Sequence, residues 1–168
     1  MLTDINLSSI EYICLNLREL DKTEIFSIRP HNSPVLLAWE AHYLIRNSGR
    51  GRVAWWNGRP AAMIALVEER KSVWSVSMFG TDAFRNVAFT CMRWARENLR
   101  EVVSELGGKR LHCDSHVNHH EAHKFLRAMG AVEEGPPMQG FGKDGSAYVR
   151  FVWLAGINDQ VLRSVNTQ

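Results

Sequence analysis

The chain has 168 residues and a mass of 19.2 kDa, which is the size of one compact domain, 1–168. Its hydrophobic fraction of 45% and charged fraction of 23% are those of a globular protein and exclude disordered and fibrous classes. A formal net charge of +2 does not indicate a nucleic-acid partner. No apolar run reaches the ~18–20 residues of a membrane span, and residues 1–6 do not resemble the start of a signal peptide.

The N-terminal segment, 1–50, is predicted to be helical. Apolar residues recur there at helical spacing, as at Ile10, Ile13 and Cys14, and again from Val35 through Trp39 to Tyr43 and Leu44. Three helix starts precede such runs. They are a capping box of Ser8 with Glu11, a weaker box of Asp21 with Glu24, and Ser33 before Pro34.

The next segment, 51–80, changes from helical spacing to strands. Residues 52–56 and 60–67 flank Asn57-Gly58, whose two positions tolerate positive φ and therefore favour a two-residue hairpin turn. A polar connection, 68–71, leads to a third predicted strand, 72–79, in which serine alternates with apolar residues. This segment therefore predicts a hairpin followed by a central strand.

The segment 81–153 opens with the longest predicted helix, 84–106, which Gly107-Gly108 ends. Its apolar stripe runs from Phe84 to Leu106 and includes Phe84, Val87, Cys91, Ala95, Leu99, Val102 and Leu106. A strand (110–113), a helix (118–129), two strands (131–134 and 148–153) and a tail (154–168) follow. The order predicts an α/β domain with a mixed, mostly antiparallel sheet flanked by helices.

The turn that opens the long helix resembles the acyl-CoA loop of the GNAT acetyltransferases. In that superfamily R/Q-x-x-G-x-G/A holds the acetyl-CoA pyrophosphate with backbone N–H groups at a helix N-terminus, where phosphate is favoured. The matching residues here are Arg85, Asn86, Val87, Ala88, Phe89 and Thr90. The resemblance implies a GNAT-type fold and makes these six residues the candidate pyrophosphate loop. Because Ala88 and Thr90 replace both glycines, we expect acetyl-CoA binding to be weak or absent.

A second segment also resembles the GNAT pattern, N-x-x-A-x-x-F-Y-x-x-x-G-F. Ala122, Phe125 and Gly130 match it, whereas His119 stands at the asparagine position and Leu126 at the position of the tyrosine general acid. Leucine has no proton to donate. The strand 72–79 also lacks the glutamate that many members use as a base. The sequence therefore assigns no catalytic residue.

Nearly the whole chain is similar to a bacteriophage family that includes the GNAT-like internal virion protein of short-tailed phages. The matching stretches are 16–24, 74–82, 119–131 and 140–145. This resemblance implies a structural role in a virion on a GNAT scaffold. It also implies synthesis in the bacterial host cytoplasm and portal, tail or internal virion proteins as partners.

Two functions therefore stay open from the sequence. The first is a virion-associated structural protein without acetyltransferase activity and with no cofactor. The alternative is an acetyl-CoA-dependent N-acetyltransferase of unknown acceptor. A structural role requires an exposed contact surface, for which we expect one of Trp55 and Trp56 together with the segment 136–141, Phe141 included.

Five of the seven histidines lie within twelve residues, and the group also includes Cys113 and Asp114. The five are His112, His116, His119, His120 and His123. Helical spacing of His116, His119 or His120, and His123 could present two or three imidazoles to one zinc ion. No recognised zinc signature fits, however, and the segment spans a strand, a loop and a helix start. We therefore predict polar residues near a helix N-terminus and no metal site.

Overall fold

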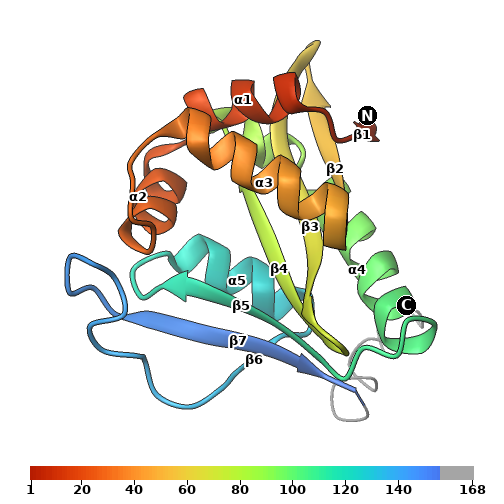
Figure 1. Cartoon of the computed structure of the whole chain (residues 1–168), viewed down its shortest axis with the longest axis vertical. Coiled ribbons are helices and arrows are strands. Elements are labelled where there is room, and N and C mark those ends of the chain that lie inside the picture. The colour runs from red at the N-terminus through yellow and green to blue at the C-terminus, as the bar shows by residue number, and fades with distance from the viewer. Residues whose placement is uncertain (156–168) are drawn as a thin grey trace.

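A seven-stranded sheet with the order β1-β2-β3-β4-β5-β7-β6 runs through the computed structural model, which describes residues 1–155 (Figure 1). Neighbouring strands pair antiparallel except β4 and β5, which are parallel. The predicted α/β class with a mostly antiparallel sheet is therefore confirmed. The strands are β1 (Leu2–Asp4), β2 (Gly49–Trp56), β3 (Arg59–Arg70), β4 (Val73–Gly80), β5 (Arg110–His116), β6 (Val132–Glu133) and β7 (Tyr148–Leu154).

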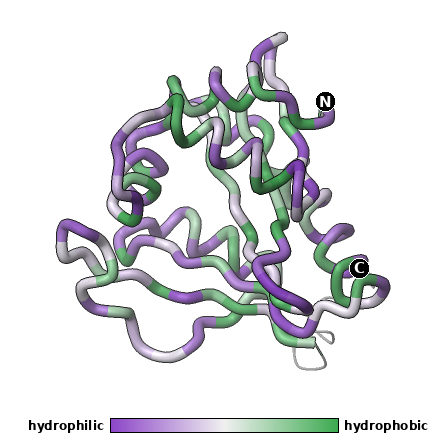
Figure 2. Tube along the Cα trace, viewed as in Figure 1, coloured by the Kyte–Doolittle hydropathy of each residue, from purple (hydrophilic) through white to green (hydrophobic). Residues whose placement is uncertain are grey.

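Helices cover both faces of the sheet. They are α1 (Leu7–Leu15), α2 (Glu19–Ser27), α3 (Pro34–Ser48), the 3₁₀ helix η1 (Asp82–Asn86), α4 (Ala88–Ser104) and α5 (His120–Ala128). In β3, Ile64 and Leu66 belong to the core under α4 and α5, whereas Met63 and Ala65 belong to the core under α1–α3. Figure 2 shows β3 hydrophobic along most of its length and the turn after it hydrophilic. A strand buried on both faces therefore separates two cores.

The parallel strands β4 and β5 pair over only three residues each. Val73, Trp74 and Ser75 lie opposite Arg110, Leu111 and His112. Beyond this point β4 continues to Gly80 and β5 to His116, and Figure 1 shows the two strands diverging. The sheet therefore opens at its centre, and η1 and the start of α4 follow directly from the end of β4.

One of the three predicted helix starts is confirmed. Ser33 accepts the Leu36 N–H at 3.3 Å, and Pro34 opens α3. The Ser8–Glu11 box is wrong, because α1 begins earlier and the Asn6 side chain accepts the Ser9 N–H at 2.9 Å.

The Asp21–Glu24 box is also wrong. Helix α2 begins at Glu19, and its N-cap, Arg18, makes no side-chain cap hydrogen bond. Asp21 and Glu24 instead lie inside the helix, where their carboxylates accept hydrogen bonds from β4, β5 and the residue that precedes α5. Tertiary contacts, and not helix capping, hold these two side chains.

Other boundaries differ where local periodicity is weak. The segment 1–50 is not wholly helical, because Leu2–Asp4 forms an edge strand on β2, and β2 itself begins at Gly49. The long helix divides into η1 and α4, and β5 extends three residues beyond its predicted end. In the predicted tail, Leu154 ends β7, and residues 156–168 lie outside the described residues.

The Asn57-Gly58 turn is confirmed, with φ values of 48° and 75° between strands β2 and β3. Trp56 is exposed, whereas Trp55 is half-buried and donates to the Thr3 hydroxyl at 2.8 Å. Phe141 is partly exposed and packs its ring against Tyr148, with 5.1 Å between ring centroids. Within residues 1–155, no helix is long and apolar enough to cross a membrane.

Candidate active site

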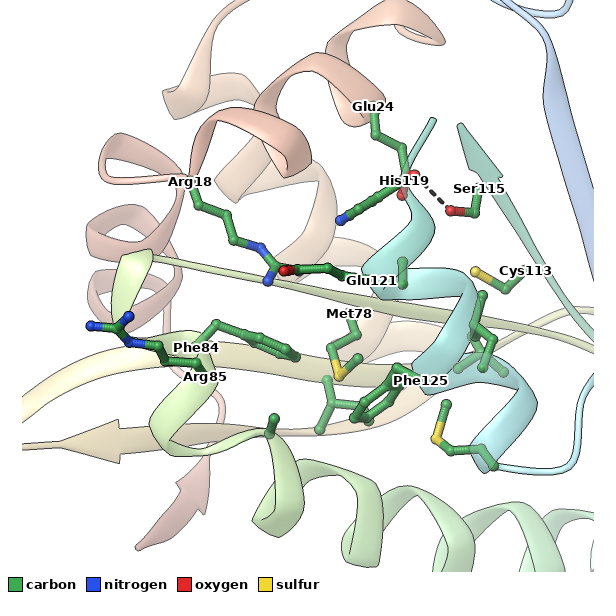
Figure 3. Close-up of a pocket in the computed structure, with 16 residues that line it drawn as sticks. Arg18, Glu24, Met78, Phe84, Arg85, Cys113, Ser115, His119, Glu121 and Phe125 are labelled. Carbon is green, nitrogen blue, oxygen red and sulfur yellow. Dashed lines mark hydrogen bonds and ion pairs between the residues drawn. The ribbon is translucent and has the colours of Figure 1, made fainter. Parts of the chain in front are cut away.

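A cavity of about 270 Å³ lies where β4 and β5 diverge (Figure 3). Its volume is close to the lower end of small-molecule pockets, roughly 300 Å³. Most of the wall is apolar and comes from the sheet, η1 and α5: Ile64, Val76, Met78, Phe84, Phe125 and Met129. Polar side chains gather elsewhere on the wall: Arg18, Glu24, Ser115, His119 and Glu121. The cavity can therefore hold an apolar or amide-containing chain next to a group of titratable side chains.

The Glu24 carboxylate of α2 closes the polar end of the pocket. Its Oε2 atom accepts the Ser115 hydroxyl at 2.8 Å and the His116 N–H at 2.7 Å, and lies 3.0 Å from His119 Nδ1. These three donors belong to β5 and to the residue that precedes α5. One oxygen atom therefore fixes α2 against the far side of the opening.

A second carboxylate, that of Asp21, lies beside the first and is fully buried. Asp21 pairs with Arg18 Nε at 2.9 Å and accepts the Gly80 N–H at the end of β4 at 2.8 Å. Burial raises the pKa of Asp21, an effect that Arg18 opposes. The Arg18 guanidinium also lies 4.2 Å from the Phe84 ring centroid, a cation–π contact on the pocket wall. Arg18 and Asp21 thus join α2 to the end of β4.

His119 carries a buried polar atom without a hydrogen-bond partner. Its side chain is 3% exposed, and Nε2 makes no hydrogen bond within the described part of the chain. The closest acid, Asp21 Oδ1, is 3.7 Å away. Because His119 lines the cavity and buried polar atoms are normally satisfied, this atom indicates a place for a ligand or water group.

The six residues of the predicted pyrophosphate loop span the end of η1 and the first turn of α4. Arg85 and Ala88 line the cavity, whereas Val87 is buried in the core under α4. Asn86 and Phe89 are exposed, and Thr90 is half-buried and does not line the cavity. No side chain caps α4, so its first N–H groups are free to bind an anion.

The second GNAT-like segment lies along the opposite wall. Ala122, Phe125 and Leu126 of α5 all line the cavity, and Gly130 follows the helix with a φ of 85°. Leu126 is buried at the position where the family pattern has its tyrosine. This wall therefore supplies packing surface and no proton donor at that position.

The five histidine side chains do not converge on one point, although the His120 and His123 rings lie edge to face with 6.0 Å between their centroids. His119 faces Glu24, His123 Nε2 lies 3.1 Å from the His116 carbonyl, and His112 is 3.5 Å from Glu69. Among the residues described, no group of three or more histidine, cysteine or acidic side chains is arranged to hold a metal ion.

Sequence reasoning missed the contribution of α2. Arg18, Asp21 and Glu24 were absent from the candidate set because Asp21 and Glu24 fit a local capping pattern. The sequence does contain one indication of their position. Asp21 and Glu24 are three residues apart and next to Ile25 and Phe26, a spacing that places both acids close to the buried face of a short helix.

No protein-family model and no curated protein matches the chain. Solved acetyltransferases share its fold. The spermidine N-acetyltransferase of Vibrio cholerae in complex with CoA and spermine superposes with a TM-score of 0.68 at 14% identity, covering 94% of this chain and 96% of that one. The ribosomal-protein-S5-alanine acetyltransferase of Vibrio fischeri superposes with a TM-score of 0.65 at 11% identity, covering 93% of this chain and 93% of that one.

A third structure is RimL, the ribosomal L7/L12 alpha-N-protein acetyltransferase in complex with coenzyme A. Its TM-score is 0.67 at 9% identity, covering 91% of this chain and 92% of that one. At identities this low, the similarity shows a shared fold and does not show a shared substrate. The chain is thus a single α/β domain with the fold of the GNAT acetyltransferases.

Proposed function

We propose that the protein is an N-acyltransferase that uses acetyl-CoA or a related acyl-CoA. One observation carries the proposal: the cavity between the diverging parallel strands extends from the uncapped start of α4 to the hydrogen-bonded pair of half-buried Glu24 and buried His119. This arrangement brings an anion site, an apolar channel and acid–base groups together. A structural role in a virion gives no reason for such an arrangement.

The residues fit a CoA thioester in three respects. The first N–H groups of α4 and the Arg85 side chain suit a diphosphate. The apolar wall between β4 and α5 suits the pantetheine chain, which would lie on Met78 and Phe125. Two of the acetyltransferases with this fold were solved with CoA, which supports the acetyl-CoA alternative over the expectation of no cofactor.

The missing glycines do not remove the proposed anion site. Alanine and threonine keep their backbone N–H groups, and the Ala88 methyl forms part of the cavity wall. The Thr90 side chain is not part of that wall. The expectation of weak acetyl-CoA binding rested on these two side chains, and the proposal replaces it.

The charge around the polar end favours an amine as acceptor. Glu24 and Glu121 line the cavity, and Asp21 lies directly behind His119. Arg18 is the only arginine or lysine at this end among the described lining residues. Carboxylates attract a protonated amine and help to hold it near the thioester.

Isothermal titration with acetyl-CoA tests the proposal, with a paired set of alanine-to-phenylalanine variants. Ala122→Phe places a ring in the cavity and should abolish binding. Ala128→Phe adds the same ring to an exposed position of the same helix and should bind like the wild type. Absence of acetyl-CoA binding by the folded wild-type protein would refute the proposal.

The virion role stays a prediction from the sequence resemblance. It expects the protein, made in the bacterial host cytoplasm, to associate with portal, tail or internal virion proteins. Mass spectrometry of purified particles of a short-tailed phage that carries this gene would test it, and absence of the chain from those particles would contradict it.

A further inference from the structure

We infer that Glu24 is the general base of the transfer and removes a proton from the acceptor amine. The inference rests on the proposed acyltransferase function and adds the residue that performs the proton transfer. Strand β4 contains no glutamate that could act as the base, and the inference places this role on α2 instead.

The two oxygens of the Glu24 carboxylate have different surroundings. Oε2 carries all three hydrogen bonds, from Ser115, His116 and His119. Oε1 accepts none within residues 1–155, and the side chain is 17% exposed where it lines the cavity. In Figure 3 the side chain descends from α2 to meet His119 and Ser115. One oxygen is therefore anchored and the other keeps its lone pairs for a proton.

The other titratable groups on the wall are less suited to this step. His119 is 3% exposed and its Nδ1 is engaged with Glu24, so it acts as a positioning residue for the carboxylate. Burial raises the pKa of the Cys113 thiol and keeps it protonated. Glu121 is exposed, and within the described residues no hydrogen bond or ion pair anchors its carboxylate.

The step balances without any further reactant. The ammonium form of the acceptor gives one proton to Glu24 Oε1 and becomes a neutral amine. The amine lone pair then forms the N–C bond at the thioester carbonyl, the C–S bond breaks, and the electron pair leaves with sulfur. The second nitrogen proton passes to the sulfur to give the CoA thiol, and Glu24 returns its proton to solvent.

Glu24→Gln tests the assignment because glutamine preserves the shape of the side chain. Its carbonyl oxygen can accept the three anchoring hydrogen bonds, while an NH₂ group replaces Oε1. We expect CoA release from acetyl-CoA with spermidine, a lysine peptide or an N-terminal peptide to fall about 100- to 10,000-fold. Acetyl-CoA affinity should stay at the wild-type value, and the variant should still unfold in one cooperative transition. Glu19→Gln, on an exposed position of α2, should retain full activity.

A second nucleophile separates base catalysis from a structural effect. Hydroxylamine is largely unprotonated at neutral pH, so Glu24→Gln should transfer acetyl to it at nearly the wild-type rate. Equal rates for wild type and Glu24→Gln with an alkyl amine would overturn the assignment and leave the proposed function intact. Loss of turnover in Glu121→Gln but not in Glu24→Gln would do the same. A wild-type protein that binds acetyl-CoA but transfers to none of these nucleophiles would also overturn it, whereas failure to bind acetyl-CoA would refute the function itself.

Discussion

Glu24 contributes to the fold as well as to the proposed chemistry. Its three hydrogen bonds join α2 to β5 and to the start of α5, across 91 to 95 residues of sequence. Glu24→Ala removes the acceptor and leaves three partly buried donors without it, so we expect a loss of about 1–3 kcal/mol in the free energy of unfolding. Chemical denaturation measures this loss. Glu24→Gln should lose less than about 1 kcal/mol, and an equal loss in both variants would show that the geometry of these bonds is wrong.

His123 makes stability depend on pH. Burial lowers its pKa below the ordinary value of 6.5, so the folded protein favours the neutral imidazole. Stability from this group is therefore complete above pH 6.5 and is lost as the pH falls through the lower folded-state pKa. As the pH is lowered below 6.5, the thermal unfolding midpoint of His123→Gln should fall by fewer degrees than that of the wild type. A parallel decline of both proteins would contradict this.

At the scale of elements, the predicted apolar stripe of α4 is confirmed as far as Val102 and is wrong at Leu106. Cys91, Ala95, Leu99 and Val102 are buried against the sheet, whereas Leu106, beyond the end of the helix, is 44% exposed. The two leucines therefore form a matched pair. Leu99→Ala should cost about 2–5 kcal/mol and Leu106→Ala less than about 0.5 kcal/mol, measured by chemical denaturation. Similar costs at both positions would contradict the packing of α4.

Sequence patterns predicted elements well where periodicity and turn chemistry were strong. The β2–β3 hairpin and α4 are examples, because Asn57-Gly58 and a long apolar stripe each favour one structure. β1 was missed because three residues carry no period and their strand exists only through pairing with β2.

The sequence does not show which face of α3 packs into the core. Leu37, Ala38 and Ile45 are buried, and the more prominent apolar residues face solvent. The exposed residues are Val35, Leu36, Trp39, Tyr43 and Leu44. A helix that is apolar on most sides has no period that identifies its inner face.

At the scale of the whole molecule, topology and not local sequence assembles the candidate site. The loop 85–90 and the α5 wall were found by their resemblance to a family pattern. Arg18, Asp21 and Glu24 reach the site only because α2 packs across the opening between β4 and β5. Contacts between segments so far apart in the chain depend on the order of the strands in the sheet. Local sequence patterns do not show this order.

The proposed function depends above all on the opening between β4 and β5 being an acyl-CoA site. A crystal structure of the protein grown with CoA tests it most directly. We predict the pantetheine chain between β4 and β5, its thiol toward Glu24, and its diphosphate at the first N–H groups of α4 beside Arg85. CoA bound on another surface, or a closed and empty cavity in crystals grown at saturating CoA, would contradict the claim.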